Sequence, residues 1–257
     1  MSIARAMTSP LRIRYMSDLH LEFSDFTPPP LEADIVVLAG DIHTGTDGLD
    51  WAARSFPETP VLYLPGNHEY YGFDLPTLYR ELAAYAKRLG IQFMNNQEVI
   101  VGDVRIIGST LWTDFELLGP STLAMLAAET GMNDYQQITH GDRSLLPIDT
   151  KSLHDIGRYY LECKLEEPFE GKTVVLTHHA PSLRSIPADR QGSQLAAAYA
   201  SDLESLTQQA DVWIHGHIHA RLQYQLGRCL VLCNPRGYKS DLYRQETGFD
   251  ERAIVEV

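Results

Sequence analysis

Cysteine is scarce in this chain, and long apolar runs are missing. Three cysteines, Cys163, Cys229 and Cys233, occur in 257 residues, too few for the disulfide framework of a small secreted domain. One C-x-x-x-C spacing without a second pair is a weak zinc signal, so we interpret all three as buried free thiols. No stretch is long enough to span a bilayer, and residues 1–10 lack the apolar core of a secretion signal. The sequence therefore predicts a cytoplasmic protein without a membrane partner.

Basic residues are also few compared with acidic ones. The chain has 21 Lys and Arg against 34 Asp and Glu, a formal net charge of −13. The field of the whole molecule repels polyanions, which disfavours nucleic acid as a partner. It does not exclude nucleic acid, because divalent metals would reverse the charge of an acidic pocket. A small anionic ligand is easier to accommodate than a long duplex.

Short apolar runs that end in glycine or polar residues recur along the chain. They are typical of strands buried on both faces, and they occupy 12–16, 35–38, 61–64, 173–176 and 212–214. Helical patterns lie between them, the clearest at 75–89, with Gly90 as the stop signal. This alternation predicts a layered α/β fold. At this length, and with 44% hydrophobic residues, one domain is sufficient.

Two further segments refine the predicted architecture. Residues 98–111 contain two apolar runs around Gly102-Asp103 and predict a hairpin. Runs 230–232 and 253–255 repeat this pattern near the C-terminal end, so we expect two sheets, one for each half of the chain. The segment 113–170 is polar, rich in helix formers and poor in strand signals, which predicts a helical cap or lid. We expect one domain over 1–257 with this cap inserted at about 113–170.

Side chains that can bind metals follow directly after five of the apolar runs. These groups are Asp18-Leu19-His20, Gly40-Asp41, Gly66-Asn67-His68, His178 and Gly216-His217-Ile218-His219. The carboxyl ends of strands meet at one edge of an open α/β sheet, so the groups should converge, and the glycines permit sharp turns there. Carboxylate, amide and imidazole ligands without thiolate suit Mn²⁺, Fe²⁺ or Zn²⁺. We expect Mn²⁺ first.

This order of motifs resembles the calcineurin-like metallophosphoesterase family, whose pattern is D-x-H, G-D, G-N-H-[DE], H and G-H-x-H. The resemblance runs from Asp18 to His219 and implies a four-layer α/β/β/α fold that hydrolyses phosphate esters. It also implies two divalent metal ions. It assigns one ion to Asp18, His20 and His219, the other to Asn67, His178 and His217, and the bridge between them to Asp41. No ligand position of the pattern is substituted.

Two such ions typically lie ~3.5–4 Å apart and activate a water molecule at neutral pH, so a metal-bridging hydroxide would be the nucleophile. The resemblance implies that His68 contacts the phosphate and protonates or stabilises the leaving oxygen, help typically worth ~10²–10⁴-fold. His68 favours a phosphodiesterase acting on a small or nucleotide-type substrate. A phosphomonoesterase and a nuclease remain alternatives on the same core. An inactive metal-binding scaffold is the alternative from another class. The sequence does not indicate an oligomeric state.

Five more residues are candidates for substrate binding. His43 follows the bridging aspartate on its loop, Asn133-Asp134-Tyr135 lie in the cap, and the guanidinium of Arg236 could bind a phosphate oxygen. Each has a structural alternative. His43 would be an exposed loop residue, Asn133 or Asp134 a helix N-cap, and Arg236 a turn residue.

Three neighbours of the motifs also allow two interpretations. His179 would point away from His178 in an extended chain, and His215 lies just before the last motif. Either could orient a ligand by hydrogen bonding or simply pack in the core. Glu69 is expected to support the site or to cap its loop.

Overall fold

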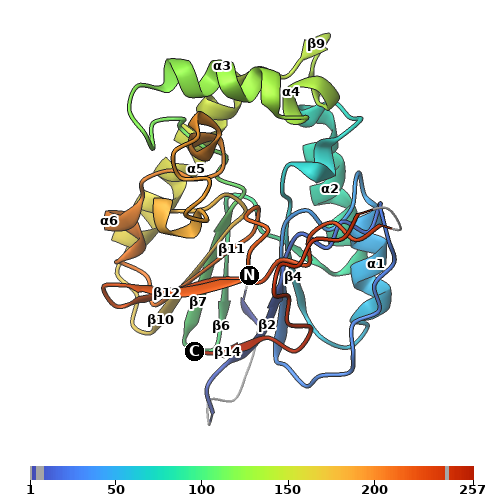
Figure 1. Ribbon diagram of the computed structural model, residues 1–257. Helices are drawn as coiled ribbons and strands as arrows, with labels where there is room; N and C mark the ends of the chain where they lie inside the picture. The colour runs from blue at the N-terminus through green and yellow to red at the C-terminus, as the bar shows by residue number, and fades with distance from the viewer. Residues whose placement is uncertain (1, 4–8, 241–242) are drawn as a thin grey trace.

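The computed structural model describes residues 2–3, 9–240 and 243–257. Two sheets face each other, with helices on their outer sides (Figure 1). The first sheet runs in the order β14 (Ile254–Glu256), β2 (Arg12–Met16), β3 (Ile35–Ala39), β4 (Val61–Leu64) and β5 (Gln92–Phe93). The second runs in the order β1 (Ser2–Ile3), β6 (Gln97–Val101), β7 (Val104–Ser109), β10 (Lys172–Thr177), β11 (Val212–His215), β13 (Cys229–Cys233) and β12 (Leu222–Leu226).

The remaining elements are helices and one small hairpin. The α-helices are α1 (Asp47–Ser55), α2 (Leu75–Leu89), α3 (Ser121–Gly131), α4 (Asp134–Gln137), α5 (Pro147–Glu166) and α6 (Glu204–Thr207). The 3-10 turns are η1 (His68–Tyr70), η2 (Leu183–Ser185) and η3 (Gln194–Ala198), and the hairpin pairs β8 (Thr139–His140) with β9 (Arg143–Ser144). Residues 1 and 4–8, part of the segment judged for a secretion signal, lie outside the described residues.

Three apolar cores separate four layers, α/β/β/α, as predicted. The strands of both sheets are buried along most of their length, as the runs of apolar residues require. The core between the sheets includes Ile13, Val37 and Leu62 from the first sheet and Ile106, Val174 and Ile214 from the second. Helices α1 and α2 cover the outer face of the first sheet, and α5 and α6 cover that of the second.

Helix α2 and the following hairpin confirm two of the predicted elements. The Asp74 side chain accepts a hydrogen bond from the Thr77 backbone N–H and so caps the N-terminus of α2. Gly90 ends the helix with a φ of 74°, a left-handed conformation that glycine adopts without a steric penalty. Strands β6 and β7 pair antiparallel around Gly102, as the spacing predicted.

The segment 113–170 divides into two parts with different positions. Helices α3 and α4 cross above both sheets (Figure 1). Helix α5 instead packs along the second sheet, where Leu161 joins the same core as Ile107 and Trp213. Its second half therefore belongs to the outer helical layer, because an apolar face with a sheet beside it is buried there.

Each end of the chain adds a strand to the sheet that is formed mainly by the opposite half. Strand β14 pairs antiparallel with β2, with Ile254 opposite Arg14, and β1 pairs with β6 of the second sheet. The expectation that 230–232 and 253–255 form a hairpin is therefore wrong, since β13 pairs with β11 and β12. Each half of the chain still supplies most of one sheet. No helix among the described residues combines the length and the apolar composition that crossing a membrane requires.

Candidate metal centre

The predicted ligands lie on loops that leave strands β2, β3, β4, β10 and β11 at one edge of the two sheets. Four of them have left-handed backbones, with φ of 49° at Asp18, 46° at His20, 57° at Asp41 and 65° at His217. Residues with a Cβ rarely adopt this region, and such conformations concentrate at functional sites. The loops also hold each other, because the Asp18 N–H donates to the carbonyl of Gly40.

Glycines allow the ligand loops to approach closely. A Cβ on Gly66 would lie 2.2 Å from Asp41 Oδ1, and one on Gly40 would lie 2.2 Å from His178 Nδ1. Any larger residue would push a ligand out of place. Gly40 and Gly66 are thus required for two reasons: a side chain there would collide with a predicted ligand, and the chain turns sharply at these positions.

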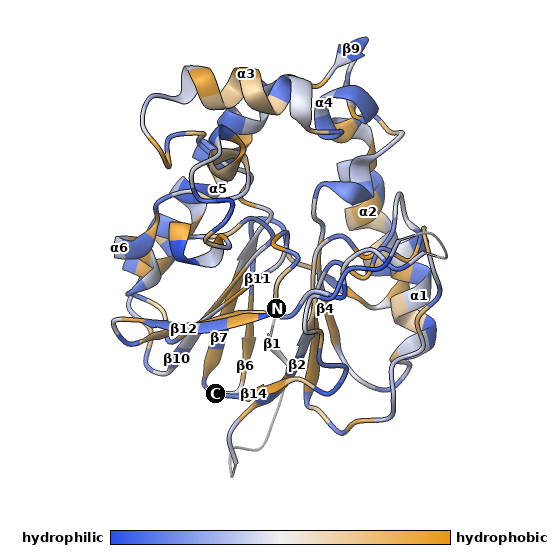
Figure 2. Cartoon of the chain, in the orientation of Figure 1, coloured by the Kyte–Doolittle hydropathy of each residue, from blue (hydrophilic) through white to orange (hydrophobic). Residues whose placement is uncertain are grey.

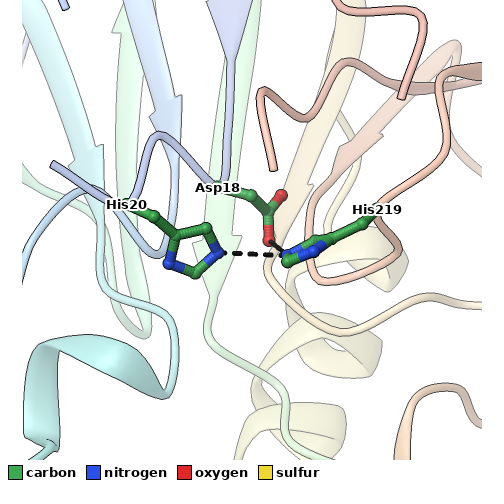
Figure 3. Close-up of side chains that lie close together, drawn as sticks. All are labelled: Asp18, His20 and His219. Atoms are coloured by element: carbon green, nitrogen blue, oxygen red, sulfur yellow. Dashed lines mark hydrogen bonds and ion pairs between the residues drawn. The ribbon is translucent and has the colours of Figure 1, made fainter. Parts of the chain in front are cut away.

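Asp18, His20 and His219 form the first group of predicted ligands, which we call the Asp18 cluster (Figure 3). The two imidazole Nε2 atoms are 3.1 Å apart, and Asp18 Oδ1 is 3.4 Å from Nε2 of His219. Nδ1 of His20 lies 3.2 Å from Glu22 Oε1, and Nδ1 of His219 lies 2.6 Å from Gln245 Oε1. Because both Nδ1 atoms donate to these oxygens, both Nε2 atoms present lone pairs to each other.

Asn67, His178 and His217 form the second group, which we call the His178 cluster. Nδ1 of His178 donates to the carbonyl of Ala39 at 2.9 Å. Its Nε2 then faces two acceptors, Asp41 Oδ1 at 3.3 Å and Asn67 Oδ1 at 3.0 Å. Nε2 of His217 is buried and has no hydrogen-bond partner among the described residues. The metal-binding atoms of Asp41, His178 and His217 lie within 4.8 Å of one another.

In both clusters, buried oxygen atoms that can only accept hydrogen bonds converge with imidazole Nε2 atoms, and in the His178 cluster a proton on His178 Nε2 takes the place that a cation would fill. Such an arrangement is costly when buried, unless a cation lies among the acceptors. The ligand atoms, carboxylate and amide oxygens and imidazole nitrogens, are those that divalent transition metals prefer. Asp41 faces both clusters, with Oδ2 4.0 Å from His20 Nε2 and Oδ1 3.3 Å from His178 Nε2. The residues present therefore fit a divalent metal site.

The carboxylates keep this centre negative. Burial raises the pKa of Asp41, but His178 and His68 outweigh it and hold that pKa well below its usual range. Burial likewise opposes the charged form of His178, yet Asp41 raises the pKa of His178 to about 10. Buried groups that favour an added positive charge to this degree are suited to bind a cation.

His68 lies between the two clusters and the solvent. Its backbone N–H donates to Asp41 Oδ1 at 2.8 Å, and its ring Nδ1 lies 2.9 Å from Glu22 Oε1. Its Nε2 lies 3.1 Å from the hydroxyl of Tyr238. Burial lowers the pKa of His68, but Asp41 and Glu22 together raise it above its usual value. The side chain can therefore hold a proton near neutral pH.

Glu69 ties two ligand loops together, as expected of a supporting carboxylate. Its oxygens accept hydrogen bonds from the backbone N–H groups of Asp41, Ile42 and Gly66 and from the hydroxyl of Tyr63. Burial, followed by the nearby Asp41, raises the pKa of Glu69 to about 7.

Asp134 connects the cap to the His178 cluster. Its Oδ1 accepts from Asn67 Nδ2 at 2.8 Å and from the Tyr71 hydroxyl at 2.6 Å. These bonds turn the amide oxygen of Asn67 towards His178. The other oxygen, Oδ2, is buried without a partner in the described part of the chain. Next to Asp134, Asn133 lines the cleft, whereas the Tyr135 hydroxyl lies 3.0 Å from Thr150 Oγ1 in the cap.

A cleft of about 260 Å³ opens over the metal centre. Its floor contains ligands of both clusters and His68. The cap supplies one wall through Gly131, Met132, Asn133 and Asp134, and the loops after β10 and β13 supply the others through Ile186, Pro187, Arg190, Tyr199, Tyr238 and Gln245. A cleft of this size suits a small ligand.

Two of the proposed substrate-binding residues lie elsewhere. The guanidinium of Arg236 donates to the carbonyls of Leu19, Ser24 and Asp25, so it braces the loop after β2 and does not line the cleft. His43 lines a separate hollow beside α1.

The two histidines with open interpretations also differ in position. Nδ1 of His179 lies 3.2 Å from the Thr110 carbonyl, and its ring is 4.3 Å from that of His217, so it packs beneath a ligand. His215 contacts Ser185 Oγ at 2.9 Å and is a core residue with satisfied hydrogen bonds.

Four side chains at the centre had no place in the motif analysis: Glu22, Arg190, Tyr238 and Gln245. Glu22 had a detectable signal, because it follows His20 at the spacing that separates His20 from Asp18. Arg190, Tyr238 and Gln245 lie in loops without periodicity, and only the tertiary fold brings them to the cleft.

One family model and several known proteins are similar to this chain. Residues 11–221 match the family model described as calcineurin-like phosphoesterase. An uncharacterized protein of Acanthamoeba polyphaga mimivirus, L509, is 26% identical over 284 residues, covering 95% of this chain and 96% of that protein. The phosphopantetheinyl hydrolase of Mycobacterium tuberculosis has a similar fold, with a TM-score of 0.68 and 14% identity over 90% of each chain. A putative 5'-nucleotidase of Staphylococcus aureus gives a TM-score of 0.45 at 16% identity, covering 88% of this chain and 48% of that one.

Proposed function

Because the chain belongs to the calcineurin-like phosphoesterase family, we propose that it is a phosphodiesterase that cleaves a small or nucleotide-type phosphodiester at a centre of two divalent metal ions. Family membership supports metal-dependent hydrolysis of phosphate esters in general. The observation that carries the finer proposal is the position of His68, which lies beside Asp41 with its Nε2 near the cleft residue Tyr238.

The Asp18 cluster would hold one ion and the His178 cluster the other, with Asp41 shared between them. Mn²⁺ is the proposed metal, with Fe²⁺ or Zn²⁺ as alternatives that suit the same ligands. When bound, such ions supply an activated water and neutralise charge on the phosphate.

His68 would act on the leaving group. Glu22 accepts at its Nδ1 and thereby orients the ring so that Nε2 is the atom available to a substrate. A proton held at Nε2 can pass to the leaving oxygen, which an alkoxide leaving group of a diester needs. The raised pKa of His68, caused by Asp41 and Glu22 against the effect of burial, favours the protonated ring.

The cap, proposed over about 113–170 within a single domain, would limit the size of the substrate. Its residues Met132 and Asp134 wall the cleft directly above the metal centre. A cleft of only about 260 Å³ and a net charge of −13 both favour a small ester over duplex nucleic acid. The three cysteines are free, which supports the proposed cytoplasmic location.

Hydrolysis of bis-p-nitrophenyl phosphate by metal-free protein supplied with Mn²⁺, Fe²⁺, Zn²⁺ or Mg²⁺ tests the proposal. We expect metal-dependent turnover that is lost in Asp41→Asn and falls by about 10²-fold or more in His68→Ala. Asp47→Asn and His140→Ala are matched controls, because both side chains are exposed and outside the cleft.

Parallel assays separate the alternatives. Faster cleavage of p-nitrophenyl phosphate than of the diester would identify a phosphomonoesterase, and cleavage of single-stranded DNA or RNA would identify a nuclease. Metal-loaded protein that turns over none of these esters would be the inactive scaffold.

A further inference from the structure

The part of the cleft away from the metal ligands contains one basic side chain. Among the described residues that line the cleft, Arg190 is the single lysine or arginine. It lies on the exposed loop between η2 and η3. No hydrogen bond or ion pair within the described part of the chain holds its guanidinium.

Arg184 on the same loop provides the contrast. Its guanidinium donates to the carbonyl of Gln225 at 3.3 Å and lies 5.4 Å from the ring centre of Tyr224, outside the cleft. One arginine of this loop therefore has a structural role. The other is free to bind a ligand.

Apolar and aromatic side chains accompany Arg190 along the cleft. Ile186 and Pro187 come from its own loop, Met132 comes from the cap, and the Tyr199 ring lies 5.1 Å from that of His217. The side chains of Ile186, Pro187 and Met132 favour an uncharged spacer, because they offer no hydrogen-bond partner to a charged group.

The cleft therefore has two places for negative charge. The metal ligands, with their ions, would take the phosphate that is cleaved, and the unpaired guanidinium of Arg190 lines the same cleft together with the apolar side chains. Arginine presents a planar fork of donors that matches carboxylate and phosphate oxygens. In a chain with a net charge of −13, an unpaired arginine directed into the substrate cleft is suited to an anion.

We propose that Arg190 forms a second anion subsite, and that the substrate is a small phosphate ester with a further anionic group beyond an apolar spacer. The second group is a carboxylate or another phosphate. This inference rests on the proposed function for the position of the first phosphate. It adds the class of substrate, which the metal centre alone does not determine.

Binding of non-hydrolysable phosphonates to Mn²⁺-loaded protein, measured by titration calorimetry, tests the proposal. Alkylphosphonates with spacers of two to five carbons are compared with analogues of the same length that end in a carboxylate or in a second phosphonate. At the best length we expect the second anion to improve affinity by about 10-fold, equal to about 1.4 kcal/mol. The carboxylate and phosphonate ends distinguish the two sources of the anion.

Variants of the loop assign the gain to one side chain. Arg190→Gln should abolish it, Arg190→Lys should retain part of it, and Arg184→Gln should leave it unchanged. A shared melting temperature shows that the variants are folded. Absence of a gain at every length, or a gain that survives in Arg190→Gln, would overturn the proposal. So would an equal loss of affinity for ligands with and without the second anion, because Arg190 would then bind the first phosphate.

The result is separable from the proposed function. If the gain depends on Arg190 but bis-p-nitrophenyl phosphate is not hydrolysed with any metal, the subsite stands and the phosphodiesterase proposal fails. If hydrolysis occurs and the gain is absent, the subsite fails alone.

Discussion

The Asp18 cluster and the His178 cluster use similar ligand atoms but are supported in different ways. In the His178 cluster, the ligand His178 is held by the backbone carbonyl of Ala39 and has no exposed side-chain surface. In the Asp18 cluster, two histidines depend on the side chains of Glu22 and Gln245, and His219 is 12% exposed. The backbone orients His178, whereas side chains orient both His20 and His219; in the His178 cluster only Asn67 depends in this way on a side chain, that of Asp134. The Asp18 cluster should therefore be the more easily altered of the two.

Removal of metal has the largest expected effect and tests this difference directly. A chelator should abolish activity, and metal should leave in two steps, first from the Asp18 cluster, whose two histidines are oriented by side chains. Bound metal stabilises the folded state by ~2.7 kcal/mol when its free concentration is 100 times the Kd, so the melting temperature should fall with each step. Metal analysis and thermal unfolding measure both.

Single-ligand variants identify the steps. His219→Ala should eliminate the step that occurs first, and His217→Ala the step that occurs second. Loss in one step in the unmodified protein would contradict the difference between the clusters.

Glu22→Gln should have the next largest effect, because Glu22 contacts both His20 and His68. Hydrogen-bonded partners of metal ligands typically contribute about 10–100-fold to metal affinity or activity. Glu22 also raises the pKa of His68, so its loss lowers that pKa. The acid form of His68 is then lost at lower pH, and the alkaline limb of the kcat profile should move to lower pH. An unmoved limb would count against this role. Glu116→Gln, at an exposed carboxylate, is the control.

Asp134→Ala should weaken the His178 cluster by a smaller amount. Without this carboxylate the Asn67 amide can rotate and present its N–H₂ group to the metal, and we expect about 10-fold lower metal affinity. Tyr71→Phe removes the other hydrogen bond to Asp134 and the longer contact of the Tyr71 hydroxyl with Asn67 Nδ2 at 3.2 Å, but it leaves the Asp134–Asn67 hydrogen bond, so metal affinity should fall less than in Asp134→Ala. Calorimetric titration with Mn²⁺ measures both, and equal losses in the two variants would refute the explanation.

Tyr238→Phe should have the smallest effect. The variant keeps the ring against His20 and His219 and loses only the hydroxyl near His68 Nε2. A hydrogen bond of this kind contributes ~0.5–1.5 kcal/mol, so kcat should fall by about 2–10-fold with unchanged metal affinity. A steady-state assay checks this, and a loss of bound metal would instead show that the hydroxyl supports the Asp18 cluster.

The sequence predicted the proposed metal ligands at the bottom of the cleft better than the residues that form its walls. The seven proposed ligands follow strand ends, and the parallel strands of a sheet bring such positions to one edge. The walls depend on long loops, where no period indicates which side chain points inward. Arg190 and Tyr238 gave no signal for this reason. Arg236 had suitable chemistry for a phosphate, but three backbone carbonyls occupy its guanidinium.

The layers of the fold were predictable for a related reason. Continuous apolar runs identified the buried strands, and the 3.6-residue period identified α2. The same signals could not distinguish a cap helix from a layer helix, since α5 exposes Ile148, Ile156 and Tyr159 and so does not show which of its faces is buried. Helix α3 shows the same ambiguity, with Leu123 and Leu126 exposed and the ribbon mostly in apolar colours (Figure 2). The sequence of neither helix predicts the surface against which that helix packs.

The pairing of β14 with β2 has a consequence for synthesis of the protein. A ribosome produces β14 after every other described strand, so β2 leaves the exit tunnel long before its neighbour exists. Until then, the nascent chain carries an open strand edge next to the loop of Asp18 and His20. His219 and Gln245 also arrive late. The Asp18 cluster can therefore be completed only near the end of translation. During elongation, the open edge of β2 has to be protected by a factor that binds the nascent chain.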